Sequence, residues 1–242
     1  HNGDLFKVDS SDKVSEEVRQ NYHSIIYKLL FIAKRSRPDI LMNISYLSSY
    51  VNNCTNNKCE YLGKLLYYLN GSLNRGLKFV GGSNIDLKVY ADASFANHDD
   101  LYGRTGVIVT SCGGIIATKS SKQTIQAMSS TESELLALYS AIKMSNDLYR
   151  KCQSFSIICS KPIIYQDNMN LIAMMKKVKP YDLSKKHITL QYHAAHEAIK
   201  EGDVYIEYCS TDNMVADIMT KPLMGEVFQK FVNIIVPLVR CI

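Results

Sequence analysis

The chain has 242 residues, of which 46% are hydrophobic, so it is long enough for one large domain or two smaller ones and apolar enough to bury a core. This composition excludes a largely disordered protein, and no apolar run reaches the roughly 18 residues of a transmembrane helix. A net charge of +5 at pH 7 is mild and by itself leaves nucleic-acid binding open.

The first part of the chain, from about residue 15 to 80, carries apolar residues at helical spacing. Three helical segments are predicted, namely IIYKLLFIAKRS, DILMNISYLSSYV after Pro38, and CEYLGKLLYYLNGS, which ends at Gly71. The Gly-Gly-Ser sequence at 81–83 indicates a turn or hinge, after which the pattern changes. We therefore expect residues 1–83 to form a small helical segment.

Alternating patterns follow the hinge and predict three strands, LKVYADAS, GVIVTS and GIIATKS. Gly113-Gly114 marks the hairpin between the last two. A helix is then predicted over about 130–150, with Ser130 or Thr131 as its N-cap. The remaining elements in order are a strand PIIYQD, a helix from Asn168, a basic stretch, a helix near 187–201, a strand DVYIEYCS and a helix 212–221 stopped by Pro222.

Three antiparallel strands followed by alternating helices and strands predict an α/β fold, a mixed sheet with helices on both faces, over residues 84–225. Residues 226–242 are expected to form an amphipathic helix or a tail that packs on a neighbour.

Seven cysteines are scattered along the chain, at positions 54, 59, 112, 152, 159, 209 and 241. Their number is odd, and they form neither a Cys-x-x-Cys pair nor a zinc-finger spacing, so reduced thiols and an intracellular compartment are expected. The chain starts with His1 in a polar segment without a secretory signal, which suggests a processed product or a fragment.

Two aspartates stand at unusual places in the predicted strands. Asp92 lies inside LKVYADAS, where β-branched residues are preferred and an acid is disfavoured. Asp167 ends the strand IIYQD, and the carboxyl ends of strands in α/β sheets are where ligands bind. Both positions are suited to a ligand site.

Two further acids lie in predicted helices. At 100° per residue, Glu134 falls at the edge of the apolar stripe of its helix, whereas Glu132 falls toward solvent, so Glu134 should face the sheet. Asp217 lies in the middle of NMVADIMTK, away from the first turn that favours acids.

Acids in one pocket need cations, because close carboxylates raise each other's pKa. Oxygen ligands select Mg²⁺ or Mn²⁺, and two such ions support phosphodiester hydrolysis without a protein nucleophile. Taken singly, each of these acids is explained about equally well as a solvated surface or capping residue.

Several runs resemble the ribonuclease H domain of Ty1/copia-type retrotransposons over roughly residues 85–225. They are YADASFANHDDLYGRTG, SSKQTIQAMSSTESELLAL, IIYQDNMNLI and KKHITLQYHAAHEAIKEGDVYIEYCSTDNMVADIMTKPL. The upstream runs YHSIIYKLLFIAKRSRPDILMNISYLSSYV and YLGKLLYYLNGSLNRGLKFV resemble the reverse-transcriptase thumb or connection of the same Pol polyprotein.

The resemblance implies a ribonuclease-H-like fold, two Mg²⁺ ions that Mn²⁺ can replace, and cleavage of the RNA strand of an RNA–DNA hybrid during reverse transcription. Its catalytic and metal-binding residues fall on Asp92, Glu134, Asp167 and Asp217. It also implies the rest of a polyprotein as a partner, no membrane, and a cytoplasmic location, inside a virus-like particle if the element is active.

The sequence departs from the family in two ways. No Tyr-x-Asp-Asp polymerase motif is present, so DNA synthesis is not expected, and the His-bearing loop of cellular ribonucleases H is missing before Asp217. His187 is interpreted as a core or helix-capping residue. The lysine-rich segment MMKKVKPYDLSKKH, with Tyr181, is either a solvated loop or a phosphate contact.

Two alternatives to a hybrid endoribonuclease stay open. One is a catalytically silent relic, a structural or hybrid-binding module, against which the presence of all four acids argues. The other is an integrase or exonuclease of the same fold, which the order Asp, Glu, Asp, Asp disfavours because the integrase Glu comes last.

Overall fold

The computed structural model describes residues 11–81, 85–96, 101–177 and 186–239. Two compact units are formed, one by residues up to 78 together with 221–242, the other by residues 79–220. The boundaries 1–83, 84–225 and 226–242 expected from the sequence stay predictions. Within the described ranges, no helix combines the length and hydropathy needed to cross a lipid bilayer.

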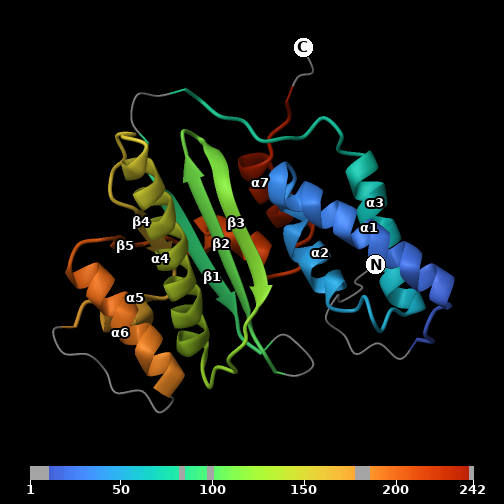
Figure 1. Ribbon diagram of the computed structural model, residues 1–242, viewed down its shortest axis with the longest axis horizontal. Coiled ribbons are helices and arrows are strands. Elements are labelled where there is room, and N and C mark those ends of the chain that lie inside the picture. The colour runs from blue at the N-terminus through green and yellow to red at the C-terminus, as the bar shows by residue number, and fades with distance from the viewer. Residues whose placement is uncertain (1–10, 82–84, 97–100, 178–185, 240–242) are drawn as a thin grey trace. The chain divides into compact units, whose positions relative to one another are not determined.

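The first unit is helical. Its α1 (Glu16–Arg35) begins at Ser15, whose side chain accepts the backbone N–H of Val18, and buries Tyr22, Ile26, Leu29 and Ala33 at helical spacing. Three elements follow, η1 (Pro38–Ile40), α2 (Leu41–Ser48) and α3 (Asn56–Asn70). The three helices expected in this part are thus present (Figure 1).

The end of the chain packs into the same unit through α7 (Gly225–Ile235). Phe228 of α7 lies edge-on to Tyr68 of α3, with 5.6 Å between the ring centroids. Beyond α7, Val239 N–H donates to the carbonyl of Asn74. The amphipathic helix expected from the final residues is present, and its partner is this chain's own helical unit.

The second unit is built on a sheet in the order β3-β2-β1-β4-β5. Its strands are β1 (Lys88–Ser94), β2 (Arg104–Ser111), β3 (Gly114–Lys122), β4 (Ile163–Gln166) and β5 (Tyr205–Tyr208). The pairs of β1 with β2 and of β2 with β3 are antiparallel, whereas β4 pairs in parallel with both β1 and β5. The predicted mixed sheet is confirmed.

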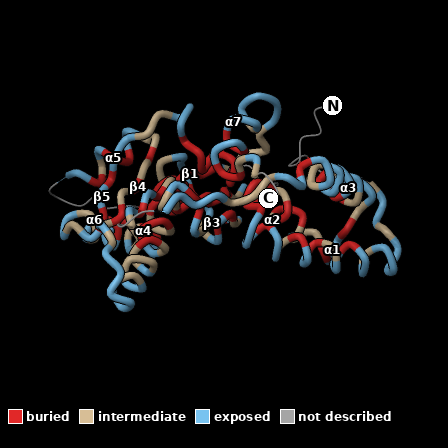
Figure 2. Tube along the Cα trace, turned by 90° about the horizontal axis from the view of Figure 1, so that it is seen from above, coloured by how far each residue is buried: buried red, intermediate tan, exposed pale blue. Residues whose placement is uncertain are grey.

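Figure 2 shows buried stretches, in red, among the helices and strands of the chain. Three α-helices share a core with one face of this sheet. They are α4 (Ser130–Ser154), α5 (Met169–Met175) and α6 (Lys186–Lys200). Val89 and Ala91 of β1 pack in this core, and the pleat turns the intervening and following residues to the other face. That face is covered near β1 and β2 by η3 (Val215–Met219).

Two sequence expectations are corrected. The N-cap of α4 is Ser129, whose hydroxyl accepts the N–H of Glu132, and not Ser130 or Thr131. The expected helix over 212–221 is replaced by two 3-10 turns, η2 (Thr211–Asn213) and η3. η3 ends at Met219, close to the expected stop before Pro222, but it is a 3-10 helix and not an α-helix.

Candidate metal centre

Asp92 lies in the middle of the sheet. It is part of β1, pairs in register with Gly106 of β2, and is only 1% exposed. Because Val89 and Ala91 face the α4 core, the pleat turns Asp92 to the face covered by η3. The hydroxyl of Thr220, the residue after η3, donates to its carboxylate. Here the disfavoured strand acid is buried and hydrogen-bonded.

Glu134 lies in the second turn of α4 and is 8% exposed, whereas Glu132 stays outside the core. Glu132 accepts the N–H of Met128 at 2.8 Å and so closes the start of the helix. Glu134 accepts the side-chain amide of Gln166 at 3.3 Å and the backbone N–H of Ala93. The helical pattern therefore distinguishes the two glutamates correctly.

Asp167 is the first residue after β4 and is half-buried. Thr211 of η2 donates its hydroxyl to the Asp167 carboxylate at 3.1 Å. The next residue, Asn168, begins α5, since its side chain accepts the N–H of Leu171 at 3.0 Å. The end of the strand and the start of the helix thus fix the place of this acid.

The three acids meet. One carboxylate oxygen from each of Asp92, Glu134 and Asp167 lies within 4.8 Å of the other two. Burial raises the pKa of Glu134 well above its ordinary value, and the charges of Asp92 and Asp167 raise it further. Oxygen donors with this surplus of negative charge are the ligands that Mg²⁺ and Mn²⁺ prefer, so the donor set fits such ions.

Asp217 is part of η3 and is buried, with 7% of its surface exposed. It is nevertheless not one of the three clustered acids. Burial raises the pKa of the Cys209 thiol, and the charges of Asp167 and Asp217 raise it further, so the charges of both acids act on one thiol. The hydroxyl of Thr220 is 3.2 Å from the carbonyl oxygen of Asp217 and also donates to Asp92. A role for Asp217 in the metal centre stays a prediction.

Three polar residues that the sequence did not point out contact the acids, namely Gln166, Thr211 and Thr220. A signal existed for Gln166, because it shares the alternation of PIIYQD with Ile164 and so places a polar residue at a core position. Thr211 lies in η2 and Thr220 directly follows η3, and the local sequence of these segments gives no such signal.

Two further sequence predictions concern His187 and the lysine-rich segment. His187 is exposed at the start of α6, so a core position is wrong, whereas a helix-capping role stays a prediction. Residues 178–185, which include Tyr181 and most of the lysine-rich segment, lie outside the described residues.

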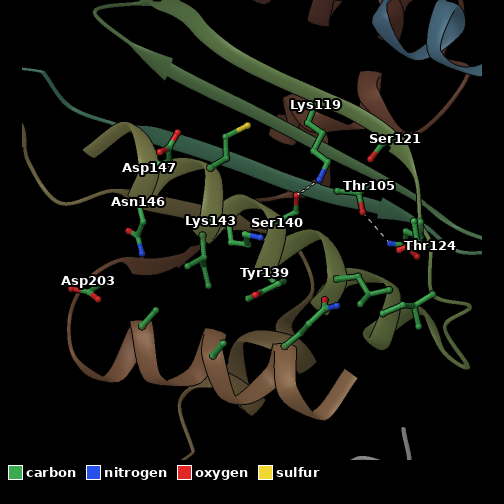
Figure 3. Close-up of a pocket in the computed structure, with 18 of the residues that line it drawn as sticks. Thr105, Lys119, Ser121, Thr124, Tyr139, Ser140, Lys143, Asn146, Asp147 and Asp203 are labelled. Atoms are coloured by element: carbon green, nitrogen blue, oxygen red, sulfur yellow. Dashed lines mark hydrogen bonds between the residues drawn. The ribbon is translucent and has the colours of Figure 1, made fainter. Parts of the chain in front are cut away.

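A separate hollow of about 950 Å³ lies along α4, between residues of β3 and α6 (Figure 3). Lys119 reaches into it and donates to the Ser140 hydroxyl at 2.6 Å. Burial lowers the pKa of Lys119, and the charge of Lys143 lowers it further. Acids line the same hollow, including Asp147 and Asp203, so its charge is mixed. None of the three clustered carboxylates lines it.

Comparison with known proteins identifies relatives among transposon polyproteins. The chain is 30% identical over 87% of its length to the Pol polyprotein of transposon RE2 from Arabidopsis thaliana. It is 30% identical over 86% of its length to that of transposon TNT 1-94 from Nicotiana tabacum, and 23% over 95% to the Ty1-LR3 Gag-Pol polyprotein of Saccharomyces cerevisiae. It spans only 14%, 16% and 13% of these proteins. The resemblance to Ty1/copia-type Pol polyproteins is confirmed.

Similar solved structures are ribonuclease H proteins and reverse transcriptases. The RNase H1 of Halobacterium salinarum NRC-1 matches with a TM-score of 0.42 and 16% identity, over 56% of this chain and 94% of that one. The foamy viral protease-reverse transcriptase in complex with dsDNA matches with a TM-score of 0.49 and 13% identity, over 82% and 42%. No family model matches the chain.

Proposed function

We propose that this chain is a ribonuclease H that cleaves the RNA strand of RNA–DNA hybrids with the help of two divalent cations. The observation that carries the proposal is the approach of Asp92, Glu134 and Asp167 to within 4.8 Å of one another in a largely buried position. The relatives among Pol polyproteins support it, because making DNA from an RNA template produces such hybrids.

The three carboxylates would serve as cation ligands in this proposal. Their oxygens would hold Mg²⁺, or Mn²⁺ in its place, and the surrounding core would keep those oxygens fixed before substrate arrives. Bound ions would activate the attacking water and stabilise the leaving oxygen of the phosphodiester. Asp217, whose charge acts together with that of Asp167 on the Cys209 thiol, would complete the set from the side of η3.

The substrate is proposed to be a hybrid, recognised by the groove shape that separates it from both duplex DNA and duplex RNA and by its RNA 2′-hydroxyls. The chain would work as part of a longer Pol polyprotein, of which it spans about one seventh. In that setting it would be located in the cytoplasm, within a virus-like particle of an active element.

The direct test is cleavage of a labelled RNA–DNA hybrid by the purified chain in Mg²⁺. We expect the RNA strand to be cut, duplex DNA and duplex RNA to stay intact, and EDTA to stop the reaction. An Asp167→Asn variant should be slower by about 1,000-fold or more, roughly 4 kcal/mol of transition-state stabilisation.

Other outcomes would point to a binding module without activity or to a contaminating enzyme. Binding of the hybrid by the parent chain, with no cleavage in either Mg²⁺ or Mn²⁺, would show a silent hybrid-binding module and contradict the proposed activity. Cleavage that Asp167→Asn leaves unchanged would show a contaminating nuclease. Binding should also weaken steeply with salt if phosphate contacts dominate it.

A further inference from the structure

Gln166 is the one fully buried amide that contacts two parts of the acid cluster among the described residues. It is 0% exposed and ends β4, directly before Asp167. Its Nε2 donates to the Glu134 carboxylate at 3.3 Å. Its Oε1 accepts the backbone N–H of Asp167 at 2.8 Å and that of Asn168 at 3.3 Å.

The orientation of this amide is fixed by its partners. Backbone N–H groups can only donate, so the carbonyl oxygen of Gln166 must face Asp167 and Asn168. The NH₂ group must then face Glu134, where it donates to a carboxyl oxygen. A flipped amide would place its NH₂ group against the two backbone N–H donors, so only one orientation satisfies these contacts.

This arrangement joins segments that are distant in sequence. Glu134 comes from α4, while Asp167 follows β4 and leads into α5, which Asn168 begins by accepting the N–H of Leu171. One side chain therefore sets the distance between a helix carboxylate and the turn that carries a second carboxylate. A mispositioned ligand carboxylate is expected to weaken a cation site even when the ligand itself is intact.

We propose that Gln166 is a positioning residue of the metal centre, which holds Glu134 and Asp167 at the spacing that a divalent cation requires. The inference rests on the proposed function in that it takes these acids as cation ligands. Gln166 itself does not touch substrate or the reacting atoms. It acts only through the two acids that it contacts.

The test uses Mn²⁺ binding, measured on the whole chain by the loss of the free-ion electron paramagnetic resonance signal. The variant Gln166→Met keeps the length and bulk of the side chain but can neither donate to Glu134 nor accept from Asp167. We expect Mn²⁺ to bind it about 10-fold more weakly or worse, the usual effect of losing a hydrogen bond to a ligand. Gln153→Met, at an exposed glutamine of α4, is the matched control and should bind as the parent does.

A second variant guards against loss of folding, which circular dichroism would reveal. Gln166→Asn keeps an amide that is one methylene shorter, so it can pair with the turn or with Glu134 but cannot reach both. It should also weaken Mn²⁺ binding. A role confined to stability would lower the unfolding temperature of both variants while leaving the Mn²⁺ affinity of the folded protein unchanged, and that result would overturn the inference.

A double variant tests whether the effect passes through Glu134. In a Glu134→Gln background the carboxylate is gone, so Gln166→Met should weaken Mn²⁺ binding by less than it does in the parent chain. Equal fold-changes in the two backgrounds would refute action through Glu134.

Failure of this inference is distinguishable from failure of the proposed function. If the parent chain binds Mn²⁺ and Gln166→Met binds it equally well, only the positioning role is wrong. If the parent binds Mn²⁺ and the variants weaken it but no hybrid is cut, the positioning role stands and the nuclease activity does not. Absence of Mn²⁺ binding by the parent chain would remove both.

Discussion

The acids of the candidate site are positioned by two different kinds of structural element. Asp92, Glu134 and Asp167 stand on or beside regular elements, a central strand, a long helix and a strand end. Asp217 stands on a short 3-10 segment and lies outside the group of three. Periodic elements place their side chains through local geometry, whereas the 3-10 segment owes its place to contacts with other parts of the chain.

Those contacts are specific. The hydroxyl of Ser120 in β3 donates to the carbonyl of Met219 at 2.6 Å, and Arg104 in β2 donates to the same Ser120 at 3.0 Å. Gly106 lets η3 approach the sheet, because a Cβ there would lie 2.6 Å from Thr220 and 2.8 Å from Met219. The comparison therefore predicts two kinds of response to mutation.

The largest expected effect separates the two neighbouring glutamates of α4. Glu134→Gln should reduce hybrid cleavage by about 1,000-fold or more, since it removes a charged cluster oxygen. Glu132→Gln should cleave at the parent rate and lose at most about 1 kcal/mol of stability, because Glu132 only closes the helix start. Cleavage rates and urea unfolding measure both, and comparable losses of activity would show that the helix face is assigned wrongly.

The next effect concerns the fourth acid. Asp217→Asn should slow cleavage by about 10- to 100-fold, some 1.4–2.7 kcal/mol, because its carboxylate lies outside the group that would hold the cation most directly. Mn²⁺ affinity should change less than in Glu134→Gln. Loss of cleavage as complete as in Glu134→Gln would show that Asp217 is as important as the three clustered acids, and would contradict the difference expected between them.

The next prediction concerns stability and tests how η3 packs on the sheet, through a substitution that changes no acid. Gly106→Ala should cost about 1–3 kcal/mol in urea unfolding, because the added methyl overlaps Thr220 and Met219. It should also slow cleavage by displacing η3. Gly63→Ala is the matched control, since a Cβ at that position in α3 meets nothing within 4 Å and alanine favours a helix. A Gly106→Ala chain as stable as the parent would show that η3 is held otherwise.

The smallest effect expected is a pH dependence of the metal-free protein. The folded state raises the pKa of Glu134 above its ordinary value of 4.5, so this carboxyl binds its proton more tightly folded than unfolded. Unfolding then releases protons, and stability should fall as the pH rises from 4.5 through the raised pKa. Thermal unfolding in EDTA measures this fall. Glu134→Gln should flatten it, and an unchanged slope in that variant would assign the pH dependence to other groups.

The sequence predicts more of the sheet and α4 than of the remaining site, for physical reasons. Alternation and helical spacing give the strand that holds Asp92 and the inward turn of Glu134, because these patterns arise from local backbone geometry. The residues 212–221 have the composition of a helix, yet contacts from Ser120 and the space above Gly106 favour tighter 3-10 turns. Such distant contacts leave no local pattern.

Gln166 shows an intermediate case. Its buried position follows from the alternation with Ile164, so a polar residue at a core position is visible in PIIYQD. Its partners are not, because Glu134 lies 32 residues away along the chain. The position of a residue within a strand can be predicted from sequence. Its contact partners cannot, because they depend on how the sheet and the helix pack together.

The most direct test of the account is a crystal structure of the chain soaked in Mn²⁺, with the ion located by its anomalous scattering. We predict a Mn²⁺ ion bound by carboxylate oxygens of Asp92, Glu134 and Asp167. Mn²⁺ bound only elsewhere, or these three carboxylates turned apart in the presence of the ion, would contradict the central claim.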